Sequence, residues 1–156
     1  MSDPKNPSEK VNMKFDRVLC DVPCSGDGTM RKNADIWPKW SASTSNNLHG
    51  IQYRILKRGM ELLEVGGRLV YSTCSMNPVE DEAVVQRMLL DAGIDNVVLE
   101  DATSLVPGLK FTPGISSWKV STKAGELFST WADVDEKSKS QIRPYMVGCI
   151  KIRFKI

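Results

Sequence analysis

The sequence predicts an α/β fold in which a mainly parallel sheet is flanked by helices. Two short apolar runs, Phe15–Cys20 and Arg68–Ser72, have the length and composition of buried strands. Two longer segments, one between these runs and one after them, repeat apolar residues at helical spacing. The alternation of strand and helix is typical of a parallel sheet joined by right-handed crossovers.

The composition is that of an ordinary globular domain. The 156 residues are 41% hydrophobic and 26% charged, and a chain of this length buries roughly 70% of its unfolded surface. Lys and Arg number 21 against 19 for Asp and Glu, and this net charge of +2 neither requires nor excludes a nucleic-acid partner. No apolar run is long enough to span a membrane, and the first ten residues lack the apolar core of a signal peptide. Four cysteines in this context predict free thiols inside a reducing compartment, without a membrane partner.

The first strand is expected between a polar lead-in and a loop. Residues 1–13 are rich in Asn, Lys, Ser and Pro, which predicts a flexible segment. The strand Phe15–Cys20 follows. Residues 21–33 then contain Gly26 and Gly28, which mark this stretch as a loop.

The first helix is expected to begin at the candidate N-caps of residues 43–45 and to extend to about Leu63. The apolar face of this helix is expected to consist of Leu48, Ile51, Ile55 and Leu62. Gln52 is expected to lie outside that face. Gly66 and Gly67 are expected to end the helix before the second strand.

A second helix is expected directly after the second strand. Asn77 suits its N-cap, Pro78 its first position, and the acidic residues 80–82 the positive end of its dipole. Gly93 is expected to end it, and Val97–Leu99 to form a third strand.

The remaining third of the chain gives weaker signals. Pro and Gly interrupt residues 101–134 repeatedly, while Trp118 and Trp131 indicate some packing. Residues 150–156 alternate apolar and basic side chains, as an edge strand does, with an unstructured tail as the alternative.

Reactive side chains follow both predicted strands at their carboxyl ends, where open α/β sheets bind their ligands. Asp21 and Cys24 come after the first strand, and Cys74 comes after the second. Because adjacent strands lie about 5 Å apart, neighbouring strands would bring two thiols and a carboxylate into one cleft. A thiolate is a strong nucleophile, and the helix expected from Asn77 would favour that form of Cys74. The second thiol and the carboxylate suit proton transfer.

Structural roles compete with this interpretation. Cys20 lies inside the strand and is predicted to be a small buried apolar residue. Its spacing to Cys24 is not the Cys-x-x-Cys of a redox helix. A zinc site would require His49, which lies mid-helix among polar residues and is expected to be exposed or half-buried, so we predict no metal.

The glycine-containing loop has further candidate roles. Residues 26–31 lack the third glycine of a dinucleotide-binding loop, and we interpret them as a flexible loop that brings backbone close to a ligand. Arg31 and Lys32 are candidate contacts to RNA phosphates, with solvated surface charges as the alternative. Trp37 and Trp40 are expected to anchor packing rather than to stack on bases.

The two cysteine segments together resemble the NOL/NOP/Sun, or RsmB-like, family of RNA cytosine-5 methyltransferases. The segments are FDRVLCDVPCSGDGTMRK at residues 15–32 and GGRLVYSTCSMNPVEDEAVV at residues 66–85. Pro-Cys and Thr-Cys-Ser are each weak signals, but their combination is specific. The similarity extends from about Phe15 to Pro144 and is strongest to the eukaryotic members that modify tRNA.

The resemblance implies S-adenosylmethionine-dependent chemistry on RNA, with tRNA as the expected partner and a nuclear or nucleolar location. Cys74 would attack carbon 6 of cytosine, carbon 5 would take the methyl group, and Cys24 would assist product release. Asp21 would bind ring nitrogen 3, and Asp21 and Pro23 would contact S-adenosylmethionine. Covalent attack is needed because an aromatic carbon is a poor nucleophile, and the base must leave its stack to be reached.

Compared with the family, the N-terminal strands and the glycine-rich cofactor loop are missing before Phe15. We therefore expect a partial Rossmann-like methyltransferase domain, with a lead-in at 1–13, the C-terminal half of the catalytic domain at 14–144 and an uncertain tail at 145–156. The exposed edge of the first strand predicts self-association. Two alternatives stay open: a non-catalytic RNA- or partner-binding module without the methyl-donor site, and a redox protein that uses its thiols.

Overall fold

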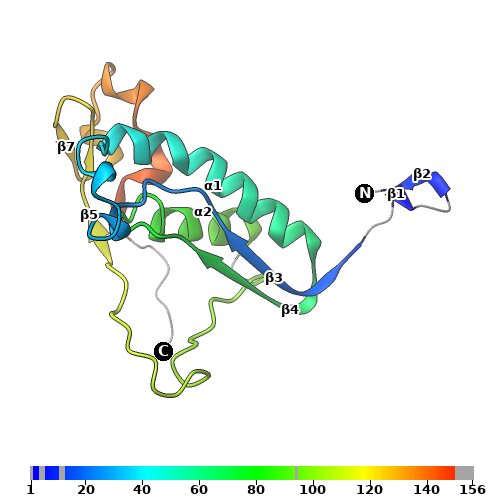
Figure 1. The fold of residues 1–156 in the computed structure, drawn as a ribbon. Helices are drawn as coiled ribbons and strands as arrows, with labels where there is room; N and C mark the ends of the chain where they lie inside the picture. Colours follow the sequence, from blue (N-terminus) through cyan, green and yellow to red (C-terminus); the bar gives the residue numbers. More distant parts are fainter. Residues whose placement is uncertain (1, 4–5, 11–12, 94, 150–156) are drawn as a thin grey trace.

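A pair of parallel strands forms the centre of the molecule (Figure 1). The structure, a computed structural model, describes residues 2–3, 6–10, 13–93 and 95–149. Strand β3 spans Phe15–Asp21 and strand β4 spans Leu63–Ser72. Their register pairs Leu19 with Val70 and Asp21 with Ser72, so both strands end at the same edge of the sheet.

Two helices complete the predicted α/β arrangement. Helix α1, Ala42–Leu62, connects the two strands, and helix α2, Glu82–Ala92, follows β4. Side chains from both helices and from β3 with its following loop share one buried cluster. Its members are Cys20, Val22, Tyr53, Leu56, Val84 and Met88. The burial of Cys20 confirms its predicted packing role.

Short elements make up the rest of the described chain. The strands, in antiparallel pairs, are β1 (Ser2–Asp3) with β2 (Asn6–Lys10), β5 (Ser117–Trp118) with β8 (Gly148–Cys149), and β6 (Val120–Ser121) with β7 (Leu127–Phe128). The 3-10 turns are η1 (Asp27–Thr29), η2 (Ala34–Ile36), η3 (Trp131–Asp133), η4 (Ser138–Ser140) and η5 (Pro144–Met146).

Helix α1 differs from its prediction at its start and on its buried face. Ser41 is the N-cap, and its Oγ accepts a hydrogen bond from the Thr44 backbone N–H at 3.3 Å. The predicted apolar face is correct only in part: Ile55 packs against the buried cluster, whereas Ile51 is exposed. The buried side chains of α1 are Ser45, Asn46, His49, Gln52, Tyr53 and Leu56. Some of these polar side chains have tertiary hydrogen-bond partners: Asn46 Nδ2, for example, donates to the Ser121 carbonyl at 2.9 Å.

The predicted glycine stop was also wrong. Helix α1 ends at Leu62, and Gly66 and Gly67 lie within β4. The register jumps from Phe15 paired with Leu63 to Arg17 paired with Arg68, so the glycines belong to a bulge in the strand. Gly66 has a φ of 81°, a left-handed conformation that favours glycine.

Helix α2 begins later than predicted. Asn77 Oδ1 accepts a hydrogen bond from the Val79 N–H at 3.0 Å and caps a turn that precedes the helix. The helix itself starts at Glu82 and ends before Gly93, as expected. No strand forms at Val97–Leu99 in the described backbone, and Val98 is 82% exposed there, so that prediction was wrong. An extended segment needs a neighbouring strand for its backbone hydrogen bonds.

A second buried cluster joins the C-terminal segment to the turn before α2. Its members are Val79, Val120, Val134, Ile142 and Met146. Trp118 and Trp131 pack against it, as predicted, and Trp118 Nε1 donates to the Met146 carbonyl at 2.8 Å. The predicted edge strand at residues 150–156 lies outside the described residues.

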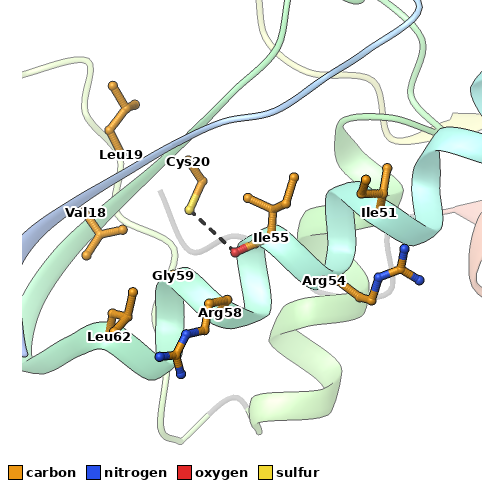
Figure 2. Close-up of a pocket in the computed structure, with 9 residues that line it drawn as sticks. All are labelled: Val18, Leu19, Cys20, Ile51, Arg54, Ile55, Arg58, Gly59 and Leu62. Carbon is orange, nitrogen blue, oxygen red and sulfur yellow. Dashed lines mark hydrogen bonds between the residues drawn. The ribbon is translucent and has the colours of Figure 1, made fainter. Parts of the chain in front are cut away.

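The sheet has one covered and one open face. Val18 and Cys20 point toward α1, whereas Leu19 points away from it (Figure 2). Leu19 is 68% exposed, and its register partner Val70 is 58% exposed. A groove of about 440 Å³ runs between β3 and α1. Among the described helices, none has the length and apolar character needed to cross a membrane.

Candidate active site

The two loops at the carboxyl ends of β3 and β4 bring two cysteines together. Cys24 Sγ and Cys74 Sγ are 3.1 Å apart, and both are free thiols. The Cys74 backbone N–H also donates to Cys24 Sγ at 3.3 Å. The convergence expected from the strand ends is therefore present in the structure.

Backbone hydrogen bonds hold these loops side by side. The Val22 N–H donates to the Ser72 carbonyl at 3.1 Å, which extends the strand pairing into the loops. Further along, the Gly28 N–H donates to the Cys74 carbonyl at 3.0 Å. A Cβ atom at Gly28 would lie 2.8 Å from that carbonyl oxygen, so the close approach requires glycine. The structure thus places the Gly28 backbone against the second cysteine loop.

Asp21 lies at the same edge of the sheet as the thiols. It is exposed, and its Oδ1 accepts a hydrogen bond from Ser72 Oγ at 2.8 Å. Because Asp21 and Ser72 are the last register pair of the two strands, the carboxylate lies at the mouth of the cysteine loops.

The two thiols have different environments. Burial, followed by the hydrogen bond with Cys74, raises the pKa of Cys24 to about 11. Cys24 therefore keeps its proton at neutral pH, and it is the less exposed thiol of the pair. Cys74 is the more exposed residue, and either sulfur can donate in the hydrogen bond between them. When Cys24 is the donor in this hydrogen bond, it stabilises negative charge on the Cys74 sulfur.

Sequence reasoning missed the carboxylates that support these loops. Asp27 Oδ1 accepts from the Met76 N–H at 2.8 Å and from the Gly28 N–H at 3.1 Å. Glu80 is fully buried and contacts both loops. The only sequence signal was the acidic run before the second helix, which we assigned to the helix dipole. Since α2 starts at Glu82, its dipole no longer supports activation of Cys74, eight residues earlier.

Asp81 provides an acid with a perturbed pKa behind the Cys74 loop. Thr73 Oγ1 donates to Asp81 Oδ1 at 2.7 Å. Burial raises the pKa of Asp81 to about 7, with smaller contributions from neighbouring carboxylates.

The other predicted site residues lie on the surface. Pro23 is exposed, and its carbonyl accepts a hydrogen bond from Gln52 Nε2 at 2.9 Å. Arg31 and Lys32 are exposed just after η1, on the loop that carries Cys24. These cations are available to an approaching polyanion.

His49 is fully buried, which corrects the expected exposed or half-buried position. Its Nδ1 lies 2.7 Å from the Val79 carbonyl oxygen, and its ring stacks on Tyr145 with centroids 4.8 Å apart. Burial lowers the pKa of His49 to about 4, so the imidazole is neutral. Over the part of the chain that the structure describes, no group of three or more His, Cys, Asp or Glu is suited to a metal ion.

Comparison with known proteins identifies the relatives of this chain. The sequence profile of a family described as "16S rRNA methyltransferase RsmB/F" matches residues 1–112. A tRNA (cytosine(34)-C(5))-methyltransferase of Drosophila melanogaster is 57% identical over 143 residues, which cover 91% of this chain and 19% of that protein.

Two further relatives have the same type of name. A multisite-specific tRNA:(cytosine-C(5))-methyltransferase of Schizosaccharomyces pombe is 57% identical over 112 residues, covering 72% of this chain and 16% of that protein. The ribosomal RNA small subunit methyltransferase F of Aeromonas salmonicida is 39% identical over 93 residues, covering 60% of this chain and 19% of that protein. The chain thus spans a fifth or less of the length of these relatives.

Proposed function

This chain belongs to the RsmB/F methyltransferase family, and from that premise we propose that it carries the catalytic thiols of an S-adenosylmethionine-dependent RNA cytosine-5 methyltransferase. The observation that supports this proposal is the 3.1 Å separation of Cys24 and Cys74 at the ends of adjacent parallel strands. A cytosine needs two groups that act in succession at neighbouring ring carbons, and two adjacent thiols supply them.

Cys74 is the nucleophile in this proposal because it is the exposed member of the pair and its sulfur lies within hydrogen-bond distance of Cys24 Sγ. Its thiolate forms a bond to carbon 6 of the cytosine, and the ring electron pair moves toward carbon 5. Asp21, at the mouth of the loops, shares a proton with ring nitrogen 3, and this hydrogen bond stabilises the adduct. The base reaches this pocket by leaving its stack.

Attack by Cys74 changes the role of Cys24. Burial makes the largest contribution to the raised pKa of Cys24, and the hydrogen bond with Cys74 and the charge on that sulfur add to it. Once the Cys74 sulfur is bound to carbon, it no longer carries charge, and Cys24 releases its proton to solvent more easily. The Cys24 thiolate then takes the proton from methylated carbon 5. The ring double bond re-forms and Cys74 leaves as a thiolate, so one proton is released in each cycle.

The residues present fit the rim of a methyl-donor site. The Asp21 carboxylate and Pro23 are both exposed at the end of β3, while the Pro23 carbonyl is held by Gln52. An exposed carboxylate and a fixed proline ring suit contacts to a cationic ligand at this edge. When bound there, S-adenosylmethionine supplies the methyl group. Its contacts in this chain would be Asp21 and Pro23.

We propose tRNA as the RNA partner. Two of the relatives named above carry tRNA in their names, and they are the more similar to this chain. Arg31 and Lys32 would contact phosphates of the strand that presents the cytosine, since both follow the Cys24 loop.

A covalent-trapping experiment tests the proposal. With S-adenosylmethionine and tRNA that contains 5-azacytosine, we expect a protein–RNA adduct on a denaturing gel, because the nitrogen at position 5 has no proton to lose. Cys74→Ala should abolish the adduct, and Cys24→Ala should accumulate one even with ordinary tRNA. The buried Cys20→Ala variant is the matched control and should behave as the wild type.

The outcomes separate the candidate functions. An adduct that persists in Cys74→Ala would contradict the assignment of the nucleophile. RNA binding without any adduct would favour the non-catalytic module that the sequence left open.

A further inference from the structure

A single buried carboxylate joins the two cysteine loops. Glu80 is fully buried. Its Oε1 accepts hydrogen bonds from Ser25 Oγ at 2.5 Å and from Ser75 Oγ at 3.0 Å. Its Oε2 accepts from the Ser25 N–H at 2.8 Å and from Gln52 Nε2 at 2.9 Å. Four donors compensate for the loss of hydration that a buried carboxylate suffers.

The two serines have a particular place in the sequence. Ser25 directly follows Cys24, and Ser75 directly follows Cys74. Each serine is one peptide bond from a thiol-bearing residue, so the position of Glu80 constrains both cysteines. Glu80 thus joins the two loops through one side chain that belongs to neither cysteine segment, whereas Asp27 joins them from within the Cys24 loop through the Met76 N–H.

Glu80 is itself fixed to the rest of the fold. Tyr71 OH, on β4, donates to the Glu80 carbonyl at 2.6 Å. Gln52, on α1, donates both to Glu80 and to the Pro23 carbonyl, so the helix holds the carboxylate and the start of the Cys24 loop at once. The carboxylate therefore has a defined position relative to the sheet and the helix.

We propose that Glu80 is a positioning residue that sets the separation of the Cys24 and Cys74 sulfur atoms by binding the serine next to each. The catalytic meaning of that separation rests on the proposed function. The separation itself does not, because thiol proximity is measurable without RNA or methyl donor.

The test compares Glu80→Ala with Glu80→Gln in the full 156-residue chain. Alanine removes all four acceptor contacts. Glutamine restores them, because its carbonyl oxygen accepts from the Ser25 N–H and Gln52, while its amide donates to the two serine hydroxyls. Glu82→Gln is the matched control, since Glu82 is two residues away and binds the Ile115 N–H instead.

Two measurements report the positions of the sulfurs. In the first, diamide accepts two electrons and two protons from the thiols, and peptide mapping gives the rate at which the Cys24–Cys74 disulfide forms. We expect this rate to fall about tenfold or more in Glu80→Ala and to be recovered in Glu80→Gln. In the second, the alkylation of Cys24 by iodoacetamide is followed against pH. Its midpoint near 11 should move toward the ordinary thiol value in Glu80→Ala only.

The results decide the proposal in each case. An unchanged disulfide rate and an unchanged Cys24 pH profile in a folded Glu80→Ala protein would overturn it. If this variant does not fold, Ser75→Ala decides, because it removes only the hydroxyl contact from the Cys74 loop: a slower disulfide rate supports the proposal, and the wild-type rate overturns it. A failure of the RNA-trapping experiment leaves these outcomes unaffected.

Discussion

Replacement of Gly28 by alanine tests how closely the two cysteine loops must approach. The added Cβ would lie 2.8 Å from the Cys74 carbonyl oxygen, the same atom to which the Gly28 N–H donates at 3.0 Å. A carbon–oxygen contact of ordinary length requires the loops to separate by about 0.5 Å. A shift of the Cys74 backbone carries the Cys74 sulfur with it. It also moves the Cys74 N–H, which contacts Cys24 Sγ, so the two sulfur atoms change their relative position.

The expected effect is larger on reactivity than on stability. A displacement of about 1 Å at a reacting group costs about a hundredfold in rate, so about 0.5 Å predicts roughly a tenfold loss. Overpacking costs about 1–3 kcal/mol in a core, and Gly28 is exposed, so we expect about 1 kcal/mol here.

The assays are the disulfide rate of Cys24 and Cys74 and the urea unfolding of the same samples. Gly50→Ala is the control, since Gly50 lies inside α1 and an added Cβ there meets no atom within 4 Å. That variant should keep the wild-type disulfide rate and gain about 0.5–1 kcal/mol in stability. Equal disulfide rates in wild type and Gly28→Ala would refute the proposed tight contact.

Three further predictions concern pH and association. The pKa of His49 is lowered to about 4 in the folded chain, below its unfolded value of about 6.5. The free energy of unfolding of the wild type should therefore fall by about 2–3 kcal/mol from pH 7 to pH 4.5, relative to that of His49→Gln, when both are measured by urea unfolding. The pKa of Asp81 is raised to about 7 in the folded chain, so the neutral carboxyl contributes to stability at low pH, and this contribution is lost as the pH rises from about 4 to 7. In urea unfolding, Asp81→Asn should not show this pH-dependent fall in the free energy of unfolding. The open edge of β3 and the exposed Leu19 predict concentration-dependent association in sedimentation, which Leu19→Lys should weaken; a monomer at every concentration would contradict this.

The parallel pair and the thiol site were predictable from local patterns. Phe15–Cys20 and Arg68–Ser72 are apolar runs bounded by turn residues, and the helix between them requires a parallel crossover. Parallel strands end at the same edge, so the positions of Cys24 and Cys74 followed from the strand assignment once the two strands were taken as neighbours. No knowledge of distant side-chain packing was needed.

The buried face of α1 was not predictable in this way. Apolar spacing selected the side that carries Ile51, which is exposed in the groove beside β3. The buried side carries His49 and Gln52, whose partners lie 30 and 28 residues away along the chain, at Val79 and Glu80. A hydropathy pattern assigns these polar side chains to the exposed face, because the hydrogen-bond partners that allow their burial come together only when the chain has folded.

The misassigned polar residues coincide with the support of the candidate site. An apolar residue at position 52 would improve the amphipathic pattern of α1, but it would leave Glu80 and the Pro23 carbonyl without their shared donor. Selection for stability alone favours the apolar choice, since buried charges contribute little when hydrophobic alternatives fit. A buried carboxylate with four donors is therefore better explained by what it holds in place, and Ser25 and Ser75, each beside a thiol, indicate that it holds the cysteine loops.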